Sequence, residues 1–191
     1  MDRSKDSSYW IEKLNMSPHP EGGYFKEVYR PDKWKPIPGY PSDRRVLTTI
    51  YYLLEEADFS AFHRIQSPES WFFHKGEPLH IYSFEKGQLV CRELSDQEGG
   101  QLQITVEPDT WFAARLKEPK GFTLVSCAVA PGFEYKDFEL ARKEELVVRY
   151  PQEKEIIEQW GCVKTKAHLL FYLKNSRSSF FVYATISSVI R

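Results

Sequence analysis

The chain has 191 residues, enough for one domain of ordinary size with a hydrophobic core. Its 26 basic and 27 acidic residues give a net charge of -1, which favours neither a nucleic acid nor an anionic membrane as a partner. The three cysteines, Cys91, Cys127 and Cys162, are odd in number and widely spaced, which argues against a disulfide framework and a thiolate zinc site. Because the N-terminus also lacks the apolar run of a signal peptide, we expect a cytoplasmic protein.

The first predicted element is a short helix. Ser8 stands where a helix cap is expected, and the helix would run to about Asn15. Trp10, Ile11 and Leu14 share one side of it, and the stretch HPEGG ends it. Nine segments rich in aromatic and β-branched residues follow, separated by turn sequences such as EKGQ and QEGGQ. These predicted strands are 24–30, 45–56, 59–65, 69–76, 79–87, 88–95, 101–107, 110–116 and 122–133.

Closely spaced strands of this kind predict an all-β fold, an antiparallel sandwich or barrel. Two helices are expected after the strands, at 137–146 and 150–161. Pro151 suits the first turn of the second helix, and Gly161 suits its C-terminal cap. We assign residues 1–164 to a single domain.

The last residues, 165–191, form a C-terminal extension of different composition. They are apolar, Ser-rich and almost free of acidic residues, and Lys174 and Arg177 interrupt every run long enough to span a bilayer. An additional packed segment or a poorly ordered extension is the plainer interpretation. A membrane-surface or partner-binding tail and an error of gene prediction are the alternatives.

The segment AFHRIQSPESWFFHKG contains His63, Glu69 and Gly76 at a spacing that resembles the first motif of the cupin superfamily. Cupins place His-x-His a few residues before this Glu, and all three side chains face into the barrel. Here His63 takes the first His position and Ile65 the second. The second cupin motif, Pro-x-Gly-x-x-His, falls on PDTWFA, where Ala113 takes the place of the His.

Two of the four cupin metal-ligand positions are thus retained, at His63 and Glu69. A catalytic metal site typically has about three protein ligands. We therefore expect no metal cofactor, and a metal-dependent oxygenase is disfavoured. Weak metal binding stays open only if His74 or His80 points into the barrel.

The resemblance extends to four motifs in order: HPEGGYFKEVYR, FHRIQSPESWFFHKGEPL, PDTWFAA and VAPGFEYKDFEL. Together they resemble an uncharacterised single-domain branch of the cupins over roughly residues 14–160. This resemblance implies a double-stranded β-helix, or jelly roll, with a ligand-sized cavity and a homodimeric assembly. The branch is similar in fold to the dTDP-sugar 3,5-epimerases, which use a His base and a Tyr acid without metal.

The strand 24–30 carries a glutamate among aromatic residues. Strand alternation puts Phe25, Glu27 and Tyr29 on one face. An ionised Glu is costly to bury unless it is paired or used. Either Glu27 forms a buried ion pair with an arginine, or it lies at the cavity wall and binds a ligand or orients His63. The candidate arginines are Arg30, Arg64 and Arg115.

The strand 69–76 offers further candidates. Glu69, Trp71 and Phe73 alternate onto one face and His74 takes the other, while Trp111 lies in a later motif as core or pocket lid. Trp71 and Phe73 are either core residues or pocket walls. The predicted ligand-binding residues are Phe25, Glu27, Tyr29, His63, Glu69, Trp71, Phe73, His74 and Trp111.

Two classes of function fit these residues. We lean to a protein that binds a small polar molecule through hydrogen bonds from His63 and Glu69. The alternative is a metal-independent isomerase or epimerase-like enzyme on a small polar or sugar-like metabolite. Its catalytic residues would be His63 as the general base and Glu27 or Glu69 as the orienting carboxylate. A Tyr would be the acid, and Tyr82 is a candidate if its face of the strand is inside. Because a fold does not decide a function, catalysis stays open.

Overall fold

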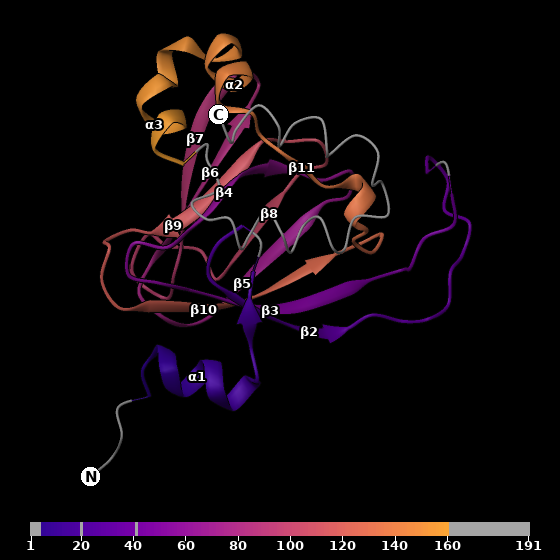
Figure 1. The fold of residues 1–191 in the computed structure, drawn as a ribbon, viewed down its shortest axis with the longest axis horizontal. Coiled ribbons are helices and arrows are strands. Elements are labelled where there is room, and N and C mark those ends of the chain that lie inside the picture. Colours follow the sequence, from indigo (N-terminus) through magenta and orange to yellow (C-terminus); the bar gives the residue numbers. More distant parts are fainter. Residues whose placement is uncertain (1–4, 20, 41, 161–191) are drawn as a thin grey trace, which may run out of the picture.

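The computed structural model describes residues 5–19, 21–40 and 42–160. Two antiparallel sheets face each other, and helices cover the outer face of each (Figure 1). This arrangement confirms the predicted all-β jelly roll with a short N-terminal helix and C-terminal helices. The extension at 165–191 lies outside the described residues, and the domain boundary at 164 stays a prediction.

The first sheet has six strands in the order β1-β2-β3-β10-β5-β8. All of its strand pairs are antiparallel. The sequence predicts every strand of this sheet except β1, which is two residues long. In sheet order, the bounds are Ser17–Pro18, Tyr24–Tyr29, Thr48–Glu55, Phe122–Val129, Glu69–Gly76 and Gln103–Val106.

The second sheet has five strands in the order β11-β4-β9-β6-β7. In this order the bounds are Glu139–Leu140, Phe59–Arg64, Phe112–Leu116, Leu79–Glu85 and Gln88–Leu94. The short strand β11 pairs with β4, with Leu140 opposite His63. The predicted helix at 137–146 is therefore wrong in its first half, because this pairing keeps the chain extended. Helix α2 (Lys143–Arg149) begins only after it.

Helix α1 (Ser7–Leu14) lies on the outer face of the first sheet (Figure 1). Its cap is Asp6 rather than Ser8, since the backbone N–H of Tyr9 donates to the Asp6 carboxylate at 2.9 Å. Asn15 ends the helix in a left-handed conformation, with a φ of 51°. The apolar side of α1, with Trp10, Ile11 and Leu14, packs against a small buried cluster of Met16, Leu53 and Leu124.

The C-terminal helices cover the outer face of the second sheet (Figure 1). They are α2, the 3-10 turn η2 (Pro151–Glu153) and α3 (Lys154–Trp160), and a second 3-10 turn, η1 (Tyr135–Asp137), precedes β11. Within the described ranges, no helix is long and apolar enough to cross a membrane. This covering buries both faces of β4, so its residues do not alternate between buried and exposed.

The main core lies between the two sheets. Strand alternation supplies it from both inner faces, as expected for a sandwich. Its buried members are Tyr52, Leu54, Trp71, Leu79, Ile81, Leu94, Ile104, Val106, Phe112, Ala114, Leu116, Val125 and Cys127. This core leaves part of the space between the sheets unfilled, and the residues around that space are the candidate site.

Candidate functional site

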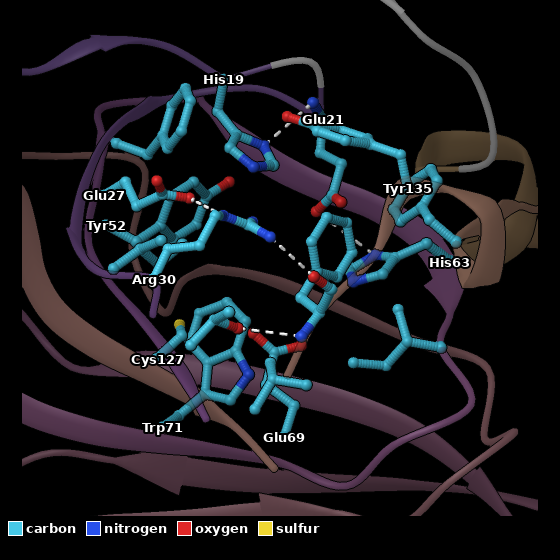
Figure 2. A pocket seen from close by; sticks show the side chains of 17 residues that line it. His19, Glu21, Glu27, Arg30, Tyr52, His63, Glu69, Trp71, Cys127 and Tyr135 are labelled. Atoms are coloured by element: carbon cyan, nitrogen blue, oxygen red, sulfur yellow. Dashed lines mark hydrogen bonds and ion pairs between the residues drawn. The ribbon is translucent and has the colours of Figure 1, made fainter. Parts of the chain in front are cut away.

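A cavity of about 70 Å³ lies between the sheets. One buried water needs about 10–15 Å³ by this measure, so the cavity holds several waters or one small molecule. Its walls come from β2, β3, β4, β5 and β10 and from the segments around residues 19–21 and 133–138 (Figure 2). The apolar and aromatic walls are Phe25, Ile50, Tyr52, Ile65, Trp71, Val129, Phe133, Tyr135 and Phe138. The polar residues are His19, Glu21, Glu27, Arg30, Thr48, His63, Glu69 and Cys127.

His63 reaches the cavity because β4 contains a bulge. The pairing with β9 runs from Ser60 opposite Ala114 to His63 opposite Phe112, so β4 has one residue more than its partner over this stretch. A bulge resets the alternation of a strand. Ser60 and His63 therefore face the same side, although residues three apart in a regular strand face opposite sides.

The imidazole of His63 is held in one tautomer. Its Nδ1 lies 2.7 Å from the carbonyl oxygen of Ala61. Because a carbonyl oxygen only accepts, Nδ1 carries the proton and Nε2 carries the lone pair. The ring is buried, with its centroid 4.1 Å from that of Phe112 and stacked on Phe138 at 5.3 Å. Burial lowers the pKa of His63, which keeps the imidazole neutral at pH 7.

Glu21 enters the cavity from the HPEGG turn. Gly22 has a φ of +117°, and a Cβ there would lie 2.2 Å from the carbonyl oxygen of Phe59, so only glycine lets the turn approach β4 this closely. The Ser60 hydroxyl donates to Oε2 of Glu21 at 2.8 Å, and the same oxygen lies 3.4 Å from Nδ1 of His63.

Burial raises the pKa of Glu21 to about 8, against a smaller opposing effect of the Ser60 hydrogen bond. The carboxyl therefore keeps its proton through the pH range in which an imidazole titrates. The contact between Glu21 and His63 is thus one between two neutral groups at pH 7, not an ion pair.

Glu69 is the second carboxyl of the cavity, and it is buried. It begins β5, opposite Val129 of β10, and hydrogen-bonds the thiol of Cys127. Burial raises the pKa of Glu69 to about 7, and Glu21 adds to the rise, while His63 and Cys127 oppose it. Burial also raises the pKa of Cys127 well above the usual value, so the thiol stays protonated. Figure 2 shows Glu21, His63 and Glu69 turned toward the same space.

Glu27 and Arg30 form an ion pair at the rim of the cavity. Oε2 of Glu27 accepts from Nε of Arg30 at 2.5 Å, and Nη1 of Arg30 donates to the carbonyl oxygen of Phe133 at 3.0 Å. The Glu27 side chain is 43% exposed, so the pair is not the buried one considered from the sequence. Glu27 lines the cavity, but its carboxylate pairs with Arg30, and the carboxyl beside His63 is that of Glu21.

Five of the nine predicted ligand-binding residues line the cavity: Phe25, Glu27, His63, Glu69 and Trp71. Tyr29 does not, because a second bulge shifts the pairing of β2 and β3 between Glu27 and Tyr29 and turns Tyr29 outward.

Three further candidates lie elsewhere. Phe73 shares the inner face of β5 but packs against the core between the sheets. His74 lies on the outer face, where its ring meets Tyr51 at 5.9 Å. Trp111 belongs to the core under α2 and α3 and lies below the guanidinium of Arg64 at 4.5 Å.

Tyr82 and His80 also lie outside the cavity. Tyr82 packs against Trp160 on the helix-covered side of the second sheet, with 4.6 Å between the ring centroids. Nε2 of His80 lies 3.6 Å from the Glu93 carboxylate. Neither residue lines the cavity. His80 therefore does not supply an additional metal ligand in the cavity, and Tyr82 does not supply the acid.

The sequence analysis did not predict Glu21 as a site residue and used the stretch HPEGG, which contains it, only as the end of the first helix. It also missed His19, Tyr52 and Tyr135, which line the cavity. The sequence contains one signal that could have pointed to Glu21. The two consecutive glycines after it allow positive φ angles, which let a turn fold back over a neighbouring strand. The other three come from segments whose proximity depends on the tertiary fold.

The residues present do not fit a cupin metal site. Ile65 lines the cavity where the second His of the motif would stand. Ala113, at the last ligand position of the motif, lies in the core under the C-terminal helices, and its neighbour Phe112 lies opposite His63. No three His, Cys, Asp or Glu side chains among residues 5–19, 21–40 and 42–160 are arranged to hold a metal ion.

Comparisons with known proteins agree with this fold. The model of a family described as "Cupin superfamily (DUF985)" matches residues 8–141. A hypothetical protein from Leishmania major has 32% identity and a TM-score of 0.75, covering 82% of this chain and 98% of its own. Protein SO0799 from Shewanella oneidensis has 33% identity and a TM-score of 0.74, covering 83% and 99%.

A more distant likeness is limited to the fold. A cupin-2 domain protein from Rhodospirillum rubrum has 12% identity and a TM-score of 0.51, covering 75% of this chain and 82% of its own. No curated protein matches the sequence.

Proposed function

The chain belongs to the cupin superfamily, in the family DUF985, and we propose that it binds a small polar molecule in the cavity around His63. One observation carries this proposal. A histidine and two carboxyls meet in a space walled mainly by aromatic and aliphatic side chains: His63 and Glu69 are buried, and the Glu21 side chain is 11% exposed. Burying such groups costs free energy unless they are paired or used, and apolar pockets with a few convergent polar groups are typical ligand sites.

The proposal does not involve a metal. A cupin metal would be held by His63 and Glu69, with apolar Ile65 and Ala113 at the other two motif positions. Two ligands fall short of the usual set of about three. We therefore propose that polar atoms of the ligand, rather than a metal ion, take the hydrogen bonds that these two side chains offer.

A second candidate function is a metal-independent isomerase or epimerase-like enzyme, and the protonation states favour it. His63 presents the lone pair of Nε2, so it is the candidate general base. The pKa values of Glu69 and Glu21, about 7 and about 8, suit groups that donate a proton near neutral pH.

Tyrosine is the poorer acid in this cavity. Burial raises the pKa of Tyr52 well above its usual value and also raises that of Tyr135. A Tyr acid is what the likeness to the epimerases suggests, but a carboxyl near neutrality transfers a proton more readily. In this alternative, Glu21 or Glu69 therefore takes the role of the acid.

A thermal-shift screen with neutral polar metabolites tests the binding proposal. Compounds that raise the melting temperature of the wild type should lose this effect in His63→Gln and Glu69→Gln, since both variants alter the polar contacts of the cavity. The matched control is His74→Gln, because His74 is an exposed histidine outside the cavity. Hits that stabilise His63→Gln as strongly as the wild type would contradict the proposal.

Compounds that pass this screen also test the enzymatic alternative. Incubation with the wild type in D₂O should introduce deuterium at the carbon that exchanges its proton, and His63→Gln should not. Binding without exchange would leave a non-catalytic binding protein. A homodimeric assembly and a cytoplasmic location remain part of the proposal, as does the lack of nucleic-acid and membrane partners.

A further inference from the structure

The indole of Trp71 leaves a buried hydrogen-bond donor without a partner. Trp71 is 2% exposed and lines the cavity, and its Nε1–H has no acceptor among the described residues. Buried N–H groups are nearly always paired with protein, water or ligand. An unpaired donor in the wall of a cavity therefore marks a place for an acceptor atom that the protein does not supply.

We infer that the ligand carries an uncharged oxygen acceptor, a carbonyl or a hydroxyl, and that this oxygen accepts a hydrogen bond from Nε1 of Trp71. The inference rests on the proposed function and gives the ligand a chemical class. It also gives Trp71 a role beyond that of an apolar wall, because the indole has one donor and no acceptor.

The surroundings of this donor disfavour an anionic ligand group. Glu69 and Trp71 project from the same face of β5, so an anion at the indole would lie beside a carboxyl. The cation of the cavity, Arg30, is already engaged by the Glu27 carboxylate and by the carbonyl oxygen of Phe133. An anion would therefore have to displace an existing ion pair.

A cationic ligand group does not satisfy the donor either. An ammonium group only donates hydrogen bonds, so it would leave the indole N–H of Trp71 unpaired. The nearby carboxyls would attract such a cation, but only in their ionised forms, which burial opposes. A neutral oxygen accepts the hydrogen bond of the indole N–H. Such a group can also form hydrogen bonds with Glu69 and His63, and its binding leaves the net charge of the cavity unchanged.

The chain supplies a matched control for this donor. Nε1 of Trp10 is also buried and without an acceptor among the described residues. Trp10 lies on α1, against the outer face of the first sheet, and does not line the cavity. Replacing Trp10 by Phe therefore removes an equivalent donor at a place where no ligand is expected.

The experiment follows the indole signals of the ¹⁵N-labelled protein by NMR. The chain has 5 tryptophans, and Trp71→Phe and Trp10→Phe assign the two signals of interest by their loss. The probes are propionamide, propionate and propylammonium, which are similar in size and differ in charge. Propionamide should shift the Trp71 indole signal and bind at least about fivefold tighter than the two charged probes.

The variants separate the outcomes. Propionamide should bind Trp71→Phe about fivefold more weakly and Trp10→Phe unchanged, as followed by backbone signals of the cavity. If these backbone signals shift while the wild-type Trp71 indole signal stays fixed, the inference is overturned and the binding function stands. Tighter binding of propionate or propylammonium also overturns it. If no probe shifts any cavity signal, the proposed function fails as well.

Discussion

Replacing Glu21 by Gln should remove a pH-dependent loss of stability. The folded protein holds the pKa of Glu21 at about 8, against an ordinary value of 4.5. Between these values the native state keeps a proton that the unfolded state has released, so the free energy of unfolding falls as pH rises, by about 1.4 kcal/mol per pH unit. The full stabilising effect is present below about pH 4.5 and is lost by about pH 8, a change on the order of 5 kcal/mol.

Gln resembles the protonated carboxyl and still accepts the hydrogen bond from Ser60, but it does not titrate. Urea unfolding at intervals from about pH 5 to pH 9 should therefore show the variant gaining stability relative to the wild type as pH rises. Glu69→Gln provides an internal comparison, since the pKa of Glu69 is about 7 and its contribution should be lost over a narrower window, on the order of 3 kcal/mol. Parallel stability curves for the wild type and Glu21→Gln would refute the burial of an uncharged carboxyl beside His63.

The remaining predictions concern the rim, an anchoring ion pair, metal content and assembly. Glu27→Gln should lower the free energy of unfolding by less than about 1 kcal/mol, because the pair with Arg30 is exposed; a thermal melt with a large drop would instead make this pair structural. Arg44→Ala should lower the free energy of unfolding by about 3 to 5 kcal/mol, because Arg44 is fully buried and its removal leaves the Asp137 carboxylate unpaired. The control is Arg92→Ala, which breaks the more exposed pair with Glu85 and should change the free energy of urea unfolding little. Elemental analysis after dialysis should find well below one equivalent of iron, manganese, nickel or zinc, and a stoichiometric metal would contradict the proposal. Light scattering should report a homodimer at micromolar concentration, since the edge strand β1 pairs only with the start of β2 and leaves Val28 and Tyr29 at its end exposed; a monomer would count against this.

The sequence predicts the strands well because each strand is encoded locally. Segments such as 48–55 and 122–129 combine β-branched and aromatic residues with clear turn signals at their ends, and the pairing then follows from the jelly roll. The helix at 137–146 is mispredicted because its first residues pair with β4, a tertiary contact that overrides the local preference.

The site is predictable only in part, because alternation fails at bulges. A regular β2 would bring Glu27 and Tyr29 to one face, and the bulge between them turns Tyr29 outward. A regular β4 would separate Ser60 from His63, and the bulge unites them. Bulges depend on the pairing partner as well as on the strand itself, so one strand read alone does not reveal them.

Glu21 illustrates a different limit. The glycines after it signal a tight turn, but the direction in which the turn folds is set by its contact with the backbone of Phe59, far away in the sequence. The residue that contacts His63 is therefore visible only in the folded chain. Glu69 and His63, in contrast, are predicted by the resemblance to the first cupin motif, in which the corresponding side chains face into the barrel.

A crystal structure with a compound that passes the thermal-shift screen tests the central claim most directly. Electron density for the compound should lie in the cavity, with a polar atom at hydrogen-bond distance from His63, Glu21 or Glu69. The structure offers a clear alternative position, the polar depression lined by Arg64, Gln66, Asp109, Lys136, Asp137, Phe138 and Glu139. Density in that depression or elsewhere on the surface, with the cavity around His63 holding only water, would contradict the account.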